Sequence, residues 1–234
     1  MTAAMSGTEP IEHVVDVPIG QVHLEGALTL PPNANAVVLF AHGSGSSRHS
    51  PRNNFVARVL HQAGLGTLLL DLLTPREDQS YATRFDIELL TRRLQGATAW
   101  LRRRPQTGHL RVGYFGASTG AAAALDAAAA LGDTIGAVVS RGGRPDLATS
   151  LDLVTAPTLL MVGGLDHEVL DLNRQALAEL TCEKELTVIR GATHLFEEPG
   201  TLDEVAHLAA RWFAKHLRTA SAATHASGAQ DSSH

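Results

Sequence analysis

Short apolar runs alternate with longer amphipathic segments along most of the chain, and the runs have the length of β-strands. The first two, at 12–18 and 22–30, alternate polar and apolar residues, which is typical of antiparallel strands with one solvated face. The later runs are continuously apolar, which predicts strands buried on both faces of a mostly parallel sheet. These strands are expected at 36–41, 66–71, 109–115, 135–140, 157–162 and 186–190.

The helices expected between these strands have recognisable ends. A Ser-Pro pair at 50–51 predicts a helix start, and Gly64 is expected to end that helix. A second helix near 84–104 carries its apolar side chains on one stripe. The last helix is predicted to open with Thr201 and Glu204 as a capping box. Strands that alternate with helices in this way predict βαβ units in a doubly wound sheet.

The chain is expected to form one domain with a short extension at each end. Its 234 residues suit a single domain, and 44% hydrophobic residues can form a sizeable core. Residues 1–10 carry little pattern and are predicted to be a mobile start. Residues 219–234 are rich in Ala, Ser and Gly and are predicted to be a disordered tail. The globular unit would span 11–218, with no room for a large inserted cap.

Composition narrows the class of protein. With 19 Lys and Arg against 24 Asp and Glu, the net charge is −5, which argues against a general nucleic-acid binder. The single cysteine, Cys182, excludes a disulfide within the chain and a four-cysteine zinc site. The first residues lack the pattern of a signal peptide, and no run reaches the ~20 apolar residues of a membrane helix. We therefore expect a soluble, cytoplasmic protein that binds neither nucleic acid nor membrane.

The strongest chemical signal is the segment GASTG at 116–120, which follows a predicted strand and precedes a predicted helix. This is the G-x-S-x-G pattern in the strand–turn–helix context of a nucleophile elbow. Small flanking residues are needed because the serine occupies a sharp, strained turn against a neighbouring strand and helix. Ser118 is therefore the predicted nucleophile. The alternative is that the glycines and alanines serve only close packing of the helix on the sheet.

A serine nucleophile needs a base, and the base needs a carboxylate to orient it. Asp166 and His194 each follow one of the last two predicted strands, where an open α/β sheet places its functional groups. We assign His194 as the general base and Asp166 as its orienting acid. Glu168 and Asp171 are alternatives to Asp166, although both are expected in or next to the following helix. Three further histidines are expected at the site's edge or in solvent: His167, His207 and His216.

A glycine-rich loop after the strand at 36–41 is the candidate oxyanion loop. The backbone N–H of Ser44, paired with that of Thr119 after the nucleophile, is expected to hold the oxyanion of a tetrahedral intermediate. Gly43 is the next candidate, because a glycine lets the backbone approach the substrate closely. His42 is expected to hold the loop through a local hydrogen bond. The alternative for the whole segment is a flexible turn.

Two arginine-bearing loops are expected at the edge of the site. Arg48 follows the oxyanion loop, and Arg141 follows the strand at 135–140. In an acidic chain, arginines gathered there suggest binding of a carboxylate or phosphate on the substrate. The alternative is that they form ion pairs with the chain's own carboxylates, such as Asp146. Two nearby aromatic residues, Tyr81 and Phe85, are expected either to line the substrate pocket or to pack in the core.

These segments together resemble the α/β-hydrolase superfamily and, within it, the small capless enzymes of the dienelactone hydrolase group. The resemblance covers about residues 12–217 and rests on the HGSG loop from His42, the GASTG elbow, Asp166 and His194 in that order. It implies an α/β-hydrolase fold with an eight-stranded, mostly parallel sheet, helices on both faces and a catalytic domain over 11–218. Dienelactone hydrolases proper carry a cysteine nucleophile, so Ser118 favours a general carboxylesterase.

The activity that the resemblance implies is hydrolysis of small or extended soluble carboxylic esters through an acyl-enzyme, without a metal or cofactor. A thioesterase or acyltransferase would use the same three side chains. A non-catalytic binding protein with this fold is the remaining alternative. The expected partner is a small-molecule ester, and the protein is expected to be a monomer or a homodimer.

Overall fold

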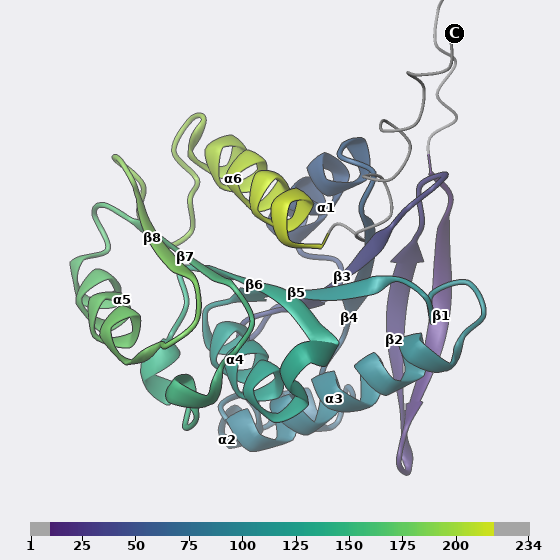
Figure 1. The fold of residues 1–234 in the computed structure, drawn as a ribbon. Helices are drawn as coiled ribbons and strands as arrows, with labels where there is room; N and C mark the ends of the chain where they lie inside the picture. Colours follow the sequence, from purple (N-terminus) through teal and green to yellow (C-terminus); the bar gives the residue numbers. More distant parts are fainter. Residues whose placement is uncertain (1–9, 218–234) are drawn as a thin grey trace, which may run out of the picture.

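A computed structural model describes residues 10–217 and shows an eight-stranded sheet at the centre of the molecule (Figure 1). The strands lie in the order β1-β2-β4-β3-β5-β6-β7-β8. β1 and β2 form an antiparallel hairpin, β2 pairs antiparallel with β4, and all later pairings are parallel. The strands are β1 (Glu12–Ile19), β2 (Val22–Thr29), β3 (Ala36–Ala41), β4 (Gly66–Leu70), β5 (Arg111–Ala117), β6 (Ile135–Arg141), β7 (Thr158–Gly163) and β8 (Lys184–Ile189). The prediction of antiparallel strands at the start of the chain and parallel strands after them is confirmed, and the sheet is therefore mixed.

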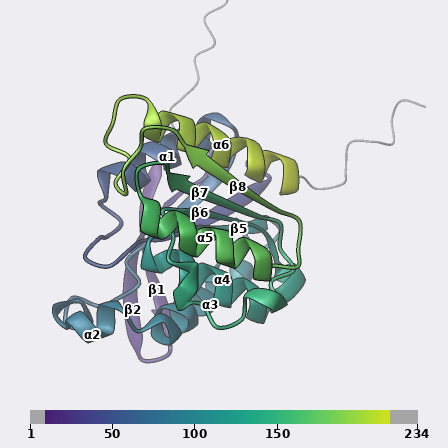
Figure 2. The ribbon, with the colours of Figure 1, turned by 90° about the vertical axis from the view of Figure 1, so that its left-hand side faces the viewer.

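Helices cover both faces of this sheet. Those described are α1 (Pro51–Gln62), α2 (Tyr81–Arg84), α3 (Ile87–Arg103), α4 (Thr119–Leu131), α5 (His167–Glu179) and α6 (Thr201–His216). α1 and α6 pack on one face, while α3, α4 and α5 pack on the other, as Figures 1 and 2 show from two directions. The predicted doubly wound α/β architecture is therefore confirmed, and within residues 10–217 the elements follow one another without a cap domain.

The central strands are apolar on both sides because each side faces a helical layer. In β3, Leu39 contacts the core beneath α3 and α4, and its neighbour Phe40 contacts the core beneath α1 and α6. In β5, Tyr114 and Phe115 divide between the same two cores. Successive side chains of a strand point to opposite faces, so a strand enclosed on both sides shows a continuous apolar run.

Several predicted boundaries are confirmed, and one is wrong. Ser50 caps α1 by accepting the Asn53 N–H, and Gly64 follows the helix with φ of +77°. The capping box at the start of α6 is wrong, because Gly200 occupies the N-cap position. The hydroxyl of Thr201 instead donates to the Glu198 carbonyl at 2.8 Å.

Two further boundaries differ by a few residues. β5 continues through Ala117, two residues beyond the predicted end, because it stays paired with β6 up to that point. The helix expected from 84 begins at Ile87, where the Asp86 carboxylate accepts the Leu89 N–H at 2.9 Å. The short α2 precedes it as a separate turn.

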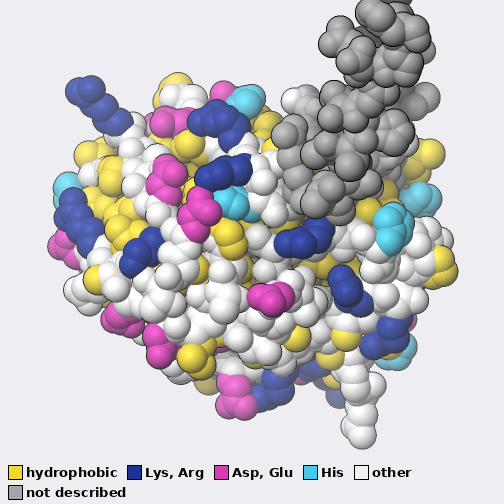
Figure 3. Space-filling model, in the orientation of Figure 1, with side chains coloured by type: hydrophobic (Ala, Val, Ile, Leu, Met, Phe, Trp, Pro, Cys, Tyr) yellow, Lys and Arg dark blue, Asp and Glu magenta, His cyan; other side chains and the backbone are white. Residues whose placement is uncertain are grey.

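The predictions for the chain ends fall almost entirely on residues 1–9 and 218–234, which lie outside the described part. Within residues 10–217, no helix combines the length and the apolar character needed to cross a membrane. Acidic and basic side chains are interspersed over the face drawn in Figure 3.

The strand order reverses its direction between β3 and β5. The connection from β3 runs through α1 to β4 on one side, while the chain after β5 continues through α4 to β6 on the other. Loops leaving neighbouring strands in opposite directions open a crevice at their carboxyl ends, which is where such sheets bind ligands. The candidate oxyanion loop follows β3, and Ser118 follows β5.

Candidate active site

Ser118 lies in a strained turn between β5 and α4. Its backbone has φ of 51° and ψ of −125°, a region that L-residues rarely adopt. Both flanking glycines are required by close packing: a Cβ on Gly116 would lie 2.9 Å from the Ala121 nitrogen, and one on Gly120 would lie 2.5 Å from the His42 oxygen. Although Ser118 holds the N-cap position of α4, its side chain makes no capping hydrogen bond. The hydroxyl is therefore available for chemistry.

Asp166 and His194 come together from the loops after β7 and β8. The Asp166 Oδ2 atom lies 2.7 Å from His194 Nδ1. Asp166 occupies the N-cap position of α5 but does not cap that helix, so its carboxylate is directed to the imidazole. The Asp166 side chain is 15% exposed and that of His194 is 40% exposed. A half-buried carboxylate accepting from Nδ1 leaves Nε2 as the ring nitrogen available to another group.

Gly142 lies next to Ser118 and to the loop that carries His194. The Ser118 N–H donates to the carbonyl of Arg141, the residue before Gly142, at 3.3 Å. A Cβ placed on Gly142 would lie 3.5 Å from His194 Cε1, so the imidazole packs directly against this glycine. Within residues 10–217, Ser118 Oγ makes no hydrogen bond, including none to His194. Such bonds are often long in free enzymes and tighten when substrate binds.

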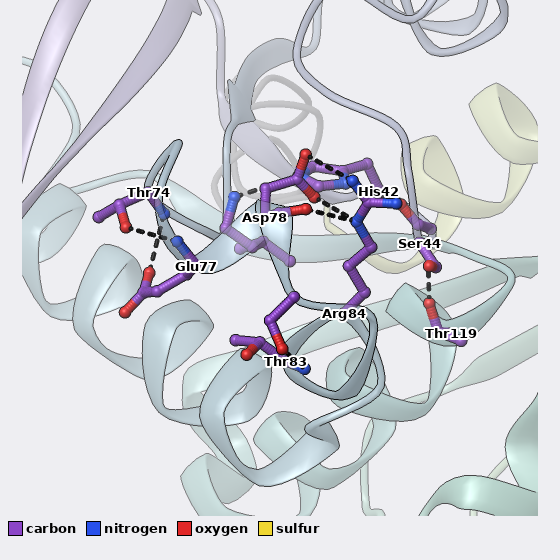
Figure 4. A network of polar contacts seen from close by, with 11 residues as sticks. His42, Ser44, Thr74, Glu77, Asp78, Thr83, Arg84 and Thr119 are labelled. Carbon is purple, nitrogen blue, oxygen red and sulfur yellow. Dashed lines mark hydrogen bonds and ion pairs between the residues drawn. The ribbon is translucent and has the colours of Figure 1, made fainter.

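The loop after β3 lies against the elbow. A Cβ added to Gly43 would lie 3.7 Å from Ser118 Oγ, which places this backbone beside the serine hydroxyl. The Ser44 N–H donates to Thr119 Oγ1 at 3.0 Å (Figure 4). The Thr119 N–H is the first of α4 and has no acceptor within that helix. Two backbone donors thus lie close to Ser118, one of them bonded to the Thr119 hydroxyl.

His42 holds the base of this loop, as expected. Its Nδ1 donates to the Gly43 carbonyl at 2.9 Å, and its Nε2 accepts the Leu72 N–H at 3.1 Å. Burial lowers the pKa of His42, which favours the neutral ring that this donor–acceptor pattern requires. The ring therefore ties the loop after β3 to the segment after β4.

The segment from 72 to 86 lies beside the loop after β3, and its residues Leu73, Asp78 and Arg84 line a small pocket with residues 42–45 (Figure 4). Arg84 Nε donates to the Asp78 carbonyl at 2.7 Å and to its carboxylate at 3.0 Å. Arg84 also lies beside the oxyanion loop, because its Nη1 would be 3.9 Å from a Cβ on Gly45. Tyr81 and Phe85 stack with centroids 4.7 Å apart and are 74% and 38% exposed. Their exposure is contrary to the core-packing alternative.

The two arginines proposed for substrate binding have different surroundings. Arg48 forms ion pairs with Asp71 and Glu25, and its backbone N–H donates to Asp71 at 2.6 Å. Its charge is therefore balanced by the chain itself. The guanidinium of Arg141 makes no ion pair or hydrogen bond among the described residues, and Asp146 pairs with Arg144 instead.

Among the described residues, the rival acids and bases make no hydrogen bond or ion pair with Asp166 or His194. Glu168 is exposed on α5, and Asp171 pairs with Arg174 on the same helix. His167 and His207 are exposed, in line with the prediction. The prediction for His216 is wrong, because its side chain is 8% exposed and stacks on Trp212 with centroids 4.4 Å apart.

One contributor to this geometry carries no signal in the sequence. Phe196 adopts φ of 55° while fully buried, and its ring lies 3.3 Å from the position of a Cβ on Gly142. A phenylalanine in a left-handed conformation cannot be recognised from residue type. No group of three or more His, Cys, Asp or Glu residues that could hold a metal occurs within residues 10–217.

The comparison with protein families matches residues 24–221 to the dienelactone hydrolase family. The chain belongs to this family. A crystal structure of a dienelactone hydrolase from Anabaena variabilis is 57% identical, with a TM-score of 0.89 over 90% of this chain and 100% of that one. Est1E from Butyrivibrio proteoclasticus is 15% identical, with a TM-score of 0.74 over 87% and 98%, a likeness of fold.

Two curated relatives from Mycobacterium tuberculosis are 59% identical over 204 residues and carry the name "Putative phosphoribosyl transferase". The match covers 87% of this chain and 46% of each relative. The chain therefore spans about half the length of these proteins. The family assignment and the 57% identical dienelactone hydrolase structure support a hydrolase.

Proposed function

We propose that the protein is a serine hydrolase of carboxylic esters, with Ser118 as nucleophile, His194 as general base and Asp166 as the orienting acid. The observation that supports it best is the 2.7 Å contact between Asp166 and His194, next to a serine in a strained elbow. An acceptor at Nδ1 holds the imidazole in the tautomer whose Nε2 can take a proton. Membership of the dienelactone hydrolase family supports the same assignment.

The reaction would proceed in two halves. His194 Nε2 removes the Ser118 hydroxyl proton as Oγ attacks the ester carbonyl, and the oxyanion accepts hydrogen bonds from the backbone N–H groups of Thr119 and Ser44. The imidazolium, stabilised by Asp166, then gives its proton to the departing alcohol. In the second half, His194 activates a water that hydrolyses the acyl-enzyme. No step calls for a metal or an organic cofactor.

The Ser44 donor must change partner in this scheme. Its N–H is bonded to Thr119 Oγ1 in the structure, so the threonine side chain has to rotate or share the donor when the oxyanion forms. Loss of one oxyanion-hole donor costs about 3 kcal/mol of transition-state stabilisation in a serine protease. The exchange of a hydroxyl acceptor for an anionic one is favourable, because charge-assisted hydrogen bonds are stronger.

The substrate proposed is a small or extended soluble ester, since residues 10–217 contain no cap domain. The same three side chains could also hydrolyse thioesters, or transfer the acyl group to an alcohol in place of water. Assays with thioester substrates and with added alcohols distinguish these activities from ester hydrolysis. For the phosphoribosyl transferase name of the longer relatives, we propose that it refers to the half that this chain does not match, because the hydrolase family match spans 24–221.

The deciding experiment is hydrolysis of a short-chain 4-nitrophenyl ester by the wild type and by Ser118→Ala. Turnover that collapses in the variant, with an unchanged melting temperature, supports the proposal. Turnover that survives shows that Ser118 is not the nucleophile. If neither protein is active, acyl-CoA and lactone substrates come next, and inactivity on all three classes contradicts the hydrolase proposal.

A further inference from the structure

The short loop at 141–144, after β6, holds the backbone of the nucleophile elbow from both sides. The Ser118 N–H donates to the Arg141 carbonyl at 3.3 Å. The Ser118 carbonyl accepts the N–H of Arg144 at 3.1 Å, as well as that of Ala121 in α4. A strained backbone such as that of Ser118 persists only where its surroundings fix it. Both peptide groups of the serine depend on this loop for that restraint.

The same loop lies against the candidate base. Gly142 is buried and has φ of +51°, and its N–H donates to the Met161 carbonyl of β7 at 2.7 Å. This turn brings its backbone against His194, since a Cβ on Gly142 would lie 3.4 Å from the His194 carbonyl oxygen and 3.5 Å from Cε1. A displacement of the loop would therefore disturb the serine and the packing of the histidine together.

One buried side chain from α5 fastens this loop. Asn173 is fully buried, and its Nδ2 donates to the Gly143 carbonyl at 3.0 Å and to the Val169 carbonyl at 2.8 Å. Within residues 10–217, the Gly143 carbonyl accepts no other hydrogen bond. The Asn173 Oδ1 atom is buried without a partner among those residues. An unpaired buried oxygen costs stability, so stability alone does not account for a polar side chain here.

The helix that carries Asn173 also begins at the candidate acid. Asp166 is the N-cap residue of α5, and Asn173 follows it by two helical turns, about 10 Å along the axis and on the same face. A helix of this length is rigid over two turns. The bond from Asn173 to Gly143 therefore sets the distance between the acid and the loop that holds the serine.

We propose that Asn173 is a positioning residue for ester hydrolysis. By holding the Gly143 carbonyl it fixes the 141–144 loop, and through this loop the Ser118 backbone, relative to Asp166 on α5. The inference rests on the proposed function and adds to it the part of the molecule that aligns the three side chains. Asn173 itself makes no hydrogen bond to the triad residues among the described contacts, so it acts through the loop.

The test removes the Asn173 donor and compares the result with a matched loss elsewhere. Asn173→Leu has nearly the same size and lacks both Nδ2 and the unpaired Oδ1, and Asn173→Ala is the second variant if leucine prevents folding. The control is Thr107→Val. The Thr107 side chain is fully buried and donates to the Leu101 carbonyl at 2.6 Å, before the amino end of β5 and so at the opposite edge of the sheet from the elbow.

We expect Asn173→Leu to lower kcat for a short 4-nitrophenyl ester by about ten- to a hundredfold, the range for a misplaced reacting group. KM should stay close to the wild-type value, because an alignment of the reacting groups acts on the transition state. Thr107→Val loses one buried hydrogen bond too and should lower the melting temperature, but its kcat should equal that of wild type. A wild-type kcat in a folded Asn173 variant, or an equal fall in Thr107→Val, overturns the proposal.

A second measurement is independent of turnover. Hydrogen–deuterium exchange should become faster at the amide N–H groups of Ser118, Gly142 and Arg144 in Asn173→Leu, because all three are bonded in or to this loop. Thr107→Val should leave their exchange unchanged. If wild type cleaves no ester, the proposed function fails, while faster exchange still supports the fastening of the loop by Asn173. Unchanged exchange at these groups overturns the inference whatever the activity.

Discussion

Gly43→Ala isolates the contact between the oxyanion loop and the nucleophile. The added Cβ would lie 2.9 Å from Ser118 Cβ and 3.2 Å from the Ala117 carbonyl oxygen. Non-bonded carbons settle at about 3.5–4.0 Å, so the loop or the elbow must move by roughly 0.6–1 Å. Neither neighbour can yield easily, because one is backbone and the other is the Cβ of a residue in a strained turn.

Two consequences follow from that displacement. Overpacking of this kind costs about 1–3 kcal/mol in the free energy of unfolding. A misplacement near 1 Å between reacting groups lowers the rate by up to about a hundredfold. We therefore expect kcat/KM for a short 4-nitrophenyl ester to fall by one to two orders of magnitude, mostly through kcat, with a moderate decrease in the urea midpoint.

Gly45→Ala is the control within the same loop. Gly45 has φ of +69°, so alanine there costs about 1–2 kcal/mol of backbone strain. Its added Cβ would meet only Arg84 Nη1, at 3.9 Å, and would leave Ser118 in place. The control should lose stability but keep most of its activity. Equal losses of activity in the two variants, or full activity in Gly43→Ala, would refute the reasoning.

Three further predictions concern the acid, the core and pH. Asp166→Asn should lower kcat by up to about 10⁴-fold, as expected for a carboxylate that sets the tautomer of a catalytic histidine. Asp171→Asn, on the helix that Asp166 precedes, should leave kcat unchanged. Comparable kcat values in the two variants would contradict the assignment. Tyr114→Phe removes a buried 2.6 Å hydrogen bond to Thr98 and should lower the free energy of unfolding in urea by about 1 kcal/mol. A change near zero would show that this bond makes no net contribution to stability. Burial lowers the pKa of His61 in the folded protein, so below about pH 6.5 the unfolded chain protonates this imidazole more readily than the folded one. The free energy of unfolding should therefore fall as the pH decreases from about 7 to about 5, and His61→Gln should reduce that fall. An unchanged dependence of the free energy of unfolding on pH would exclude this contribution.

The local patterns in the sequence predict most of the fold. All eight strands appear within two residues of their expected positions, because alternation and continuity of apolar residues reflect which faces of a strand are covered. The elbow is equally local: Gly116 and Gly120 flank Ser118 where the structure needs the absence of a side chain. Errors occur where one side chain has two competing partners, as with Thr201, whose hydroxyl bonds to a preceding carbonyl instead of capping α6.

The partners of charged and polar groups were decided by the tertiary structure. The order of strands and helices along the chain could be predicted from the sequence alone, since it depends on neighbouring residues. The same holds for the candidate residues at the carboxyl edge of the sheet. It left open whether Asp166 or Glu168 would face His194, and whether Arg48 or Arg141 would find a carboxylate. Those choices depend on the direction of side chains that leave separate strands, so only the packed sheet brings Asp166 to His194, gives Arg48 its two carboxylates and leaves Arg141 without one.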